Sequence, residues 1–154
     1  MEECDIIGPG DQPALLAIST PEVIGIAKTA LTELGYKVHT VEDCEQFELR
    51  YNQVNYQIVV IEEIFAGADS LQNPSLRMVQ NLPMSLRRHA VIFLVGPSME
   101  TLNTMQAFAL SVHCVINYSE LQILPELVQK TVAENDMFLN TYRDVQRRVY
   151  QKSA

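Results

Sequence analysis

Residues 57–70 read QIVVIEEIFAGADS, an unbroken apolar run at 58–61 that ends in two adjacent carboxylates and a loop of small residues. An apolar run of this length, without polar alternation, is typical of a β-strand that is covered on both faces. The two carboxylates, Glu62 and Glu63, stand at the carboxyl end of that strand, where parallel α/β sheets place their functional groups. This segment therefore predicts a central strand and a candidate site together.

The same alternation of apolar runs and helical spacings continues on both sides of this segment. Further strands are expected at residues 14–18, 36–41, 90–95 and 112–116, with the strand at 36–41 on an edge because its apolar positions alternate. Helices are predicted at 21–34, 43–53, 74–82 and 98–110, and from about residue 124 onward. Strands that alternate with helices in this way predict a parallel sheet with helices on both faces.

Helix boundaries follow from turn and capping residues. Thr20 is expected to cap the first helix, with Pro21 at its first position and Gly35 at its end. Asp43 is the expected cap of the second helix, and Asn73 before a proline opens the third.

The last predicted helix has no Gly or Pro after Pro125, so it is expected to outrun the domain. Its final apolar residues are spaced by four, three and four, the spacing of the contact seam between paired helices: Phe138, Tyr142, Val145 and Val149. Two heptads do not specify a coiled coil by themselves. We expect this surface, together with the fourth helix and the fifth strand, to bind a protein partner, and the long helix to form a homodimer.

Composition and charge narrow the function classes. The net charge of −8 is uneven, since residues 1–136 hold 7 Lys/Arg against 18 Asp/Glu and residues 137–154 hold four basic residues against one acid. An acidic body disfavours nucleic-acid binding. Neither a signal peptide nor an apolar stretch of membrane-spanning length is found, so a cytoplasmic protein without membrane contact is expected. We predict a flexible leader at 1–12, a domain at 13–136 and a helical extension at 137–154.

Element order and two segments, GYKVHTVED at 35–43 and QIVVIEE at 57–63, resemble the receiver domain of bacterial response regulators. The resemblance covers residues 14–136. It implies a flavodoxin-like (receiver-like) three-layer α/β sandwich, with five parallel strands in the order 2-1-3-4-5.

An active receiver uses an aspartate nucleophile, an acidic pair that holds magnesium, a Ser or Thr, and a Lys. In this chain the acidic pair falls on Ser19 and Thr20, and the nucleophile falls on Glu62. Every component is altered. The predicted degenerate phosphoacceptor pocket comprises Ser19, Thr20, Glu62, Glu63, Val95 (for the hydroxyl) and Asn117 (for the lysine). The resemblance thus implies no phosphoryl transfer, no bound metal, no cofactor and no enzymatic activity.

Purely structural interpretations of the same residues stay open. Glu62 either lies at a solvated strand end or marks the old pocket with a permanent charge. Thr20 is interpreted as a helix cap in preference to a phosphate ligand, although Ser19 and Thr20 precede a helix start that could bind an anion. A flavin or cobalamin enzyme on this scaffold would need a phosphate-binding Ser/Thr/Gly cluster or a D-x-H-x-x-G pattern, which the sequence lacks.

The resulting hypothesis is a noncatalytic pseudo-receiver that acts as a protein-interaction and dimerisation module in bacterial signalling. The alternative is an unorthodox receiver or small-anion sensor that uses the pocket around Glu62, Ser19 and Thr20.

Overall fold

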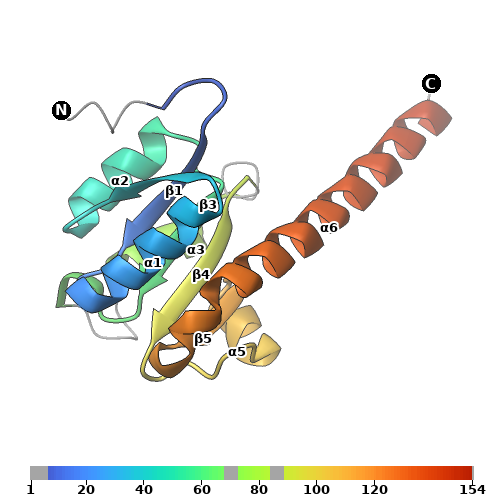
Figure 1. Cartoon of the computed structure of the whole chain (residues 1–154). Coiled ribbons are helices and arrows are strands. Elements are labelled where there is room, and N and C mark those ends of the chain that lie inside the picture. The colour runs from blue at the N-terminus through green and yellow to red at the C-terminus, as the bar shows by residue number, and fades with distance from the viewer. Residues whose placement is uncertain (1–6, 68–72, 84–88, 154) are drawn as a thin grey trace.

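The computed structural model describes residues 7–67, 73–83 and 89–153. Five strands form one parallel sheet: β1 (Gln12–Ala17), β2 (Tyr36–Thr40), β3 (Ile58–Glu62), β4 (Val91–Gly96) and β5 (Cys114–Asn117). Their order is β2-β1-β3-β4-β5, so the predicted fold and strand order are confirmed, with β2 on an edge and β3 in the centre (Figure 1). Residues 1–6 of the predicted leader lie outside the described residues, and Gln12, assigned to that leader, instead pairs with Tyr36 as the first residue of β1.

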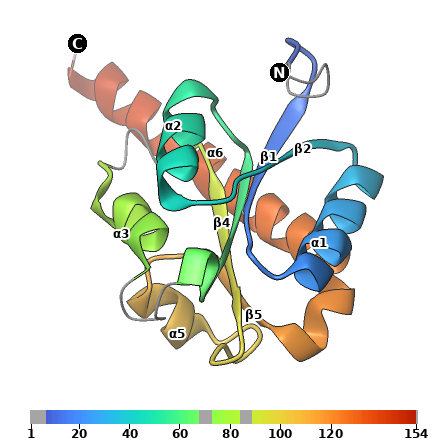
Figure 2. The same cartoon turned by 90° about the vertical axis from the view of Figure 1, so that its left-hand side faces the viewer.

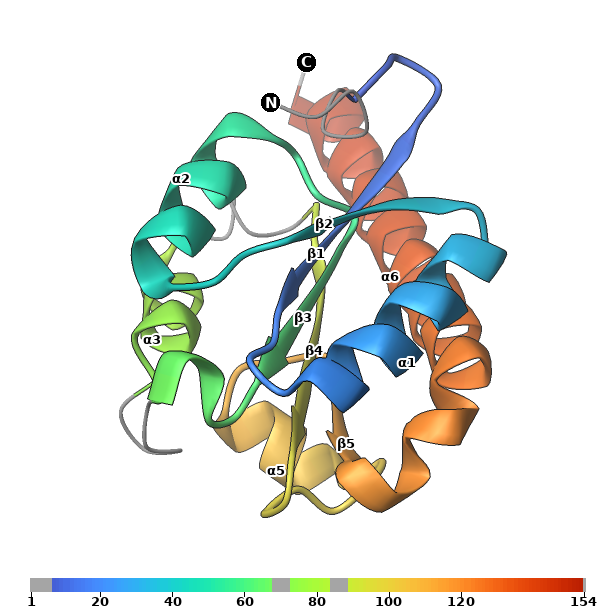
Figure 3. The same cartoon turned by 60° about the vertical axis from the view of Figure 1, so that its left-hand side comes forward.

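Helices cover both faces of the sheet. The helices α1 (Pro21–Glu33) and α6 (Leu124–Ser153) lie on one face, and α2 (Cys44–Gln53), α3 (Pro74–Asn81) and α5 (Thr104–Ala109) lie on the other (Figures 2 and 3). Two short 3₁₀ helices, η2 (Phe65–Gly67) and η3 (Tyr118–Ile123), follow β3 and β5. The second of these, η3, separates β5 from the last helix.

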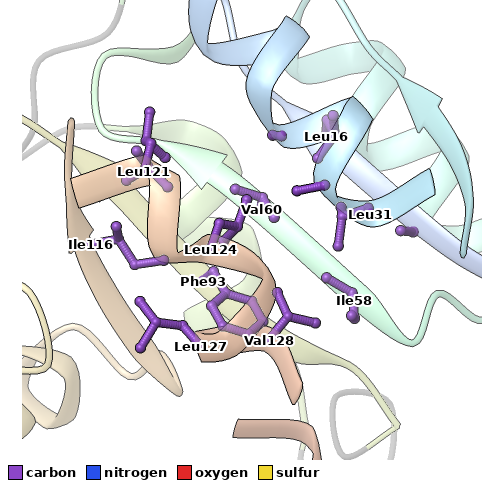
Figure 4. Packing of buried hydrophobic residues seen from close by; sticks show 14 of the residues in the cluster. Leu16, Leu31, Ile58, Val60, Phe93, Ile116, Leu121, Leu124, Leu127 and Val128 are labelled. Carbon is purple, nitrogen blue, oxygen red and sulfur yellow. The ribbon is translucent and has the colours of Figure 1, made fainter. Parts of the chain in front are cut away.

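Alternate residues of each strand supply two apolar layers, one on each side of the sheet. Leu16, Val60 and Phe93 point toward α1 and α6, where they pack with Leu31 and Val128 (Figure 4). The neighbouring residues Leu15, Val59 and Ile92 point to the other face and pack under α2, α3 and α5. Both faces of the central strands are therefore apolar up to Glu62 at the end of β3, which is why their sequences show no alternation.

The prediction of a helix over 98–110 is wrong at its beginning. The helix α5 starts only at Thr104, and Asn103 caps it by accepting a hydrogen bond from the backbone N–H of Gln106 at 2.9 Å. A helix from residue 98 would use the carbonyls of Pro97 and Met99 internally, but Asn117 Nδ2 donates to both, at 3.2 and 2.8 Å. Residue 102 also has a φ of 63°, which is incompatible with a continuing helix.

The helix α6 confirms the predicted long last helix. Its first turns pack on the sheet through Leu124, Leu127 and Val128, whereas every described side chain from residue 140 to residue 151 is exposed. Figure 1 shows these last turns projecting beyond the sheet. Within the described part of the chain, no helix has both the length and the apolar character that crossing a bilayer requires.

Candidate functional site

The carboxyl ends of β1, β3 and β5 bring three distant segments together at one edge of the sheet. Ala17 pairs with Ile61, so Ser19 and Thr20, just beyond β1, lie beside Glu62 at the end of β3. Tyr118 follows β5 directly and reaches the same point from the other side, with its hydroxyl oxygen 2.6 Å from Glu62 Oε2. The predicted pocket residues Ser19, Thr20 and Glu62 therefore do meet, with a fourth residue that the sequence did not single out.

The Glu62 carboxylate accepts four hydrogen bonds. The backbone N–H groups of Ser19 and Thr20 donate to Oε1 at 2.9 and 3.3 Å, from the turn that begins α1. The hydroxyls of Thr20 and Tyr118 donate to Oε2 at 2.7 and 2.6 Å. A carboxylate only accepts hydrogen bonds, so four convergent donors match its ionised form.

Burial rules out the interpretation of Glu62 as a solvated strand-end acid. The side chain is 0% exposed, and its neighbour Glu63 is 3% exposed. Among the residues that the structure describes, neither carboxylate forms an ion pair with a Lys, Arg or His. Leaving a buried carboxylate without polar partners would cost several kcal/mol, so the four donors are what make this position tenable.

Thr20 stands at the predicted cap of α1, but its side chain does not do the capping. Thr20 does occupy the cap position, and its backbone carbonyl accepts from Ile24 at 3.0 Å, but its hydroxyl makes no cap hydrogen bond. The hydroxyl donates to Glu62 instead.

Glu63 points to the opposite face of the sheet and belongs to a different contact. Its Oε2 accepts a hydrogen bond from the backbone N–H of Ser98 at 3.1 Å, and its side chain packs over Gly96. A Cβ placed on Gly96 would lie 2.5 Å from the Cβ of Glu63, which is far inside van der Waals contact. Position 96 therefore has to be glycine for Glu63 to be buried, and the two glutamates do not act as one acidic pair.

The loop after β3 is held against the pocket by polar side chains. Ser19 Oγ accepts from the backbone N–H of Ala66 at 2.7 Å, and Ala66 has a φ of 57° in the left-handed region. Asn73 is buried and donates to the carbonyls of Glu62 and Glu63 at 2.9 and 3.2 Å. Asn73 Oδ1 also accepts from Leu76 and caps α3, as its position before Pro74 predicted. Residues 68–70, the rest of the small-residue loop, lie outside the described residues.

The last two predicted pocket residues do not contact the carboxylate. Val95 pairs with Glu62 in the sheet and is buried among the apolar residues under α1 and α6, so it contributes an apolar wall. Asn117 turns away and fastens the loop between β4 and α5 through Pro97 and Met99. The position that corresponds to the receiver lysine thus serves a loop, and the next residue, Tyr118, contacts the carboxylate.

Tyr118 was missed because a tyrosine after a short strand carries no motif. Burial, and then the hydrogen bond donated to Glu62 and the charge of that carboxylate, raise the pKa of the Tyr118 phenol well above its usual range. The phenol is therefore a proton-bearing donor at neutral pH.

The magnesium ion that a receiver fold implies does not fit these residues. Magnesium demands carboxylate oxygens in octahedral geometry, yet Ser19 and Thr20 offer N–H groups and a hydroxyl that donates. Both oxygens of Glu62 already accept two hydrogen bonds each, and Glu63 lies on the other face. The described residues also contain no group of three or more His, Cys, Asp or Glu side chains that could hold a metal.

The fold that frames this pocket is that of response-regulator receiver domains, as superposition on solved structures shows. A response regulator of Thermotoga maritima aligns with a TM-score of 0.63 at 11% identity, covering 80% of this chain and 98% of that one. An orphan response regulator of H. pylori aligns with a TM-score of 0.61 at 16% identity, again over 80% and 98%. A fusion that carries residues 181–211 of the yeast Spc42 trimeric coiled coil aligns at 0.64 and 11% identity, over 96% and 94%.

These identities establish the fold alone. No protein-family model matches the sequence, and a search of curated proteins finds no match.

Proposed function

We propose that this chain is a noncatalytic receiver-like module that works in signalling through protein contacts and does not use phosphoryl transfer. The observation that carries the proposal is the burial of Glu62 with both carboxylate oxygens fully used by Ser19, Thr20 and Tyr118. A nucleophilic carboxylate needs a free oxygen within reach of the phosphorus atom. Here each oxygen would have to give up two hydrogen bonds first.

Two further observations support the proposal. No cation is placed to neutralise a transferred phosphoryl group among the described residues, because the lysine position is Asn117 and its amide holds a loop. The position of the fourth-strand hydroxyl is Val95, which is buried in the apolar layer. Glu62 instead supplies a permanent negative charge to the start of α1, which would fix one state of the domain and not switch it.

The small-anion sensor has less support than this. The N–H groups of Ser19 and Thr20 are the donors that an anion would need at the start of α1, and Glu62 Oε1 already occupies them. An incoming phosphate would have to displace the Glu62 carboxylate from these N–H groups. Because Glu62 belongs to the same chain, it competes at a high effective concentration.

The test is exposure of the protein to radiolabelled acetyl phosphate with magnesium, next to an active receiver domain as positive control and Glu62→Gln as the matched variant. We expect no incorporated label in either form of this protein, and no change in its melting temperature with magnesium or beryllofluoride. Stoichiometric label on the wild type that disappears in Glu62→Gln would contradict the proposal.

A further inference from the structure

The projecting part of α6 carries a continuous apolar stripe, which we call the α6 stripe: Phe138, Tyr142, Val145 and Val149. These side chains are 67%, 39%, 53% and 59% exposed. Because they are spaced by four, three and four residues, they lie along one side of the helix. Covering them would be favourable by roughly 25 cal/mol per Å² of apolar surface removed from water.

The flanks of the α6 stripe suit a second helix. Thr141 and Gln146 border it on its two sides and are uncharged, so two copies can approach without like-charge repulsion at these positions. Asn140 and Arg147 lie on the opposite side of the helix and stay in water when the stripe is covered.

The charge distribution along the chain favours a second copy as the partner that covers the α6 stripe, and it favours an antiparallel arrangement of the two helices. Residues 1–136 hold 7 basic and 18 acidic residues, a charge of −11, whereas residues 137–154 hold four basic residues and one acid, a charge of +3. A parallel helix pair would set the two acidic bodies side by side and would also set the two basic helix ends side by side. An antiparallel pair separates the bodies and brings each basic end beside exposed Glu134 and Asp136 of the other copy.

We propose that α6 pairs antiparallel with α6 of a second copy of this chain, with Phe138 facing the partner's Val149 and Tyr142 facing the partner's Val145. With this pairing, the partner of the proposed interaction module is a second copy of the chain. The role of the dimer rests on the proposed function, whereas the geometry of the dimer does not depend on the Glu62 pocket.

The proposed contact between the two α6 helices is small, so its affinity should be low. The segment from residue 138 to residue 153 is about 24 Å long. A helix pair of that length buries less than the roughly 1,200 Å² of a standard stable interface, so we expect dissociation on the order of tens of micromolar.

The first experiment is sedimentation equilibrium of the full chain across the micromolar range. We expect a monomer–dimer equilibrium in the wild type. Val145→Glu should raise the dissociation constant at least about tenfold, because it would bury an unpaired charge in the contact. Asn140→Glu, on the opposite side of the helix, is the matched control and should leave dimerisation as in the wild type. Circular dichroism checks that both variants keep their helix content.

Disulfide cross-linking tests the direction in a Cys4→Ser, Cys44→Ser background. In an antiparallel pair residue 141 lies beside the partner's residue 148, whereas in a parallel pair it lies beside the partner's residue 146. A mixture of Thr141→Cys and Arg148→Cys chains should therefore form a mixed disulfide, and a mixture of Thr141→Cys and Gln146→Cys chains should not.

The outcomes separate the two proposals. A wild type that stays monomeric, a trimer, an unaffected Val145→Glu variant or cross-linking of the parallel pair would overturn the antiparallel dimer. None of these results bears on phosphoryl transfer, and label on Glu62 would overturn the proposed function while leaving the dimer in place.

Discussion

Glu62 is the residue on which the site depends, because its one buried carboxylate accepts hydrogen bonds from two distant segments of the chain, Ser19–Thr20 and Tyr118. Glu62→Ala would leave the N–H groups of Ser19 and Thr20 and two hydroxyls without their acceptor and open a cavity. We expect a loss of about 3 kcal/mol in the free energy of unfolding. Glu62→Gln keeps one oxygen for the N–H groups, and its amide can donate to the two hydroxyls, so we expect a loss of about 1 kcal/mol.

Urea unfolding of the wild type and the two Glu62 variants measures this contrast. A Glu62→Ala variant as stable as Glu62→Gln would mean that the four hydrogen bonds do not hold the pocket together.

Tyr118 should make stability sensitive to alkaline pH. Its folded-state pKa is raised above the unfolded value of about 10, so the folded state holds the phenol proton more tightly. The stabilisation is complete below about pH 10 and is lost as the pH rises toward the folded pKa. We expect the wild type to lose stability more steeply than Tyr118→Phe as the pH rises above about 10. Urea unfolding at several pH values measures both slopes, and equal slopes would contradict the role given to the phenol.

At the scale of elements, the end of β4 packs closely against the end of β3 because Gly96 has no side chain. Gly96→Ala would drive a methyl group into the side chain of Glu63, and we expect a loss of about 2 kcal/mol from overpacking. Gly25, within α1, is the matched control, since a Cβ there would have no atom within 4 Å. Gly25→Ala should stabilise the protein by about 0.5–1 kcal/mol because alanine favours the helix.

Thermal unfolding of the two glycine variants gives the comparison. Changes of the same sign would show that backbone propensity, and not the contact with Glu63, sets the requirement at position 96.

At the scale of the whole molecule, we expect the domain and its projecting helix end to be separable. Removing the residues after Asp136 takes away side chains that are nearly all exposed. At about 1 μM, where the helix pair is dissociated, the melting temperature should stay within about 4 °C of that of the full chain. At high concentration the full chain should gain stability from dimerisation, and the shortened chain should not.

Scanning calorimetry of both chains over a range of concentrations makes the measurement. A fall of more than about 10 °C at low concentration would place the helix end within the cooperative unit, contrary to the predicted boundary at residue 136.

The sequence by itself determined the strand order, through its resemblance to receivers, and most helix boundaries, as well as the long last helix. Strands buried on both faces need unbroken apolar runs, and Asp43 and Asn73 cap helices through local contacts. Local patterns did not predict the hydrogen bonds after Ser98 or the hydrogen bond of the Thr20 hydroxyl. The partners there, Asn117 and Glu62, come from distant segments of the chain.

Only the tertiary structure decided the character of the site. Whether a carboxylate at a strand end meets water or protein donors depends on what the fold brings to it. Here Tyr118 is 56 residues away along the chain and Thr20 is 42, so no local pattern could reveal that Glu62 is buried and fully hydrogen-bonded. The sequence located the residues of the candidate pocket, and long-range contacts determined that the carboxyl group of Glu62 is buried inside the protein.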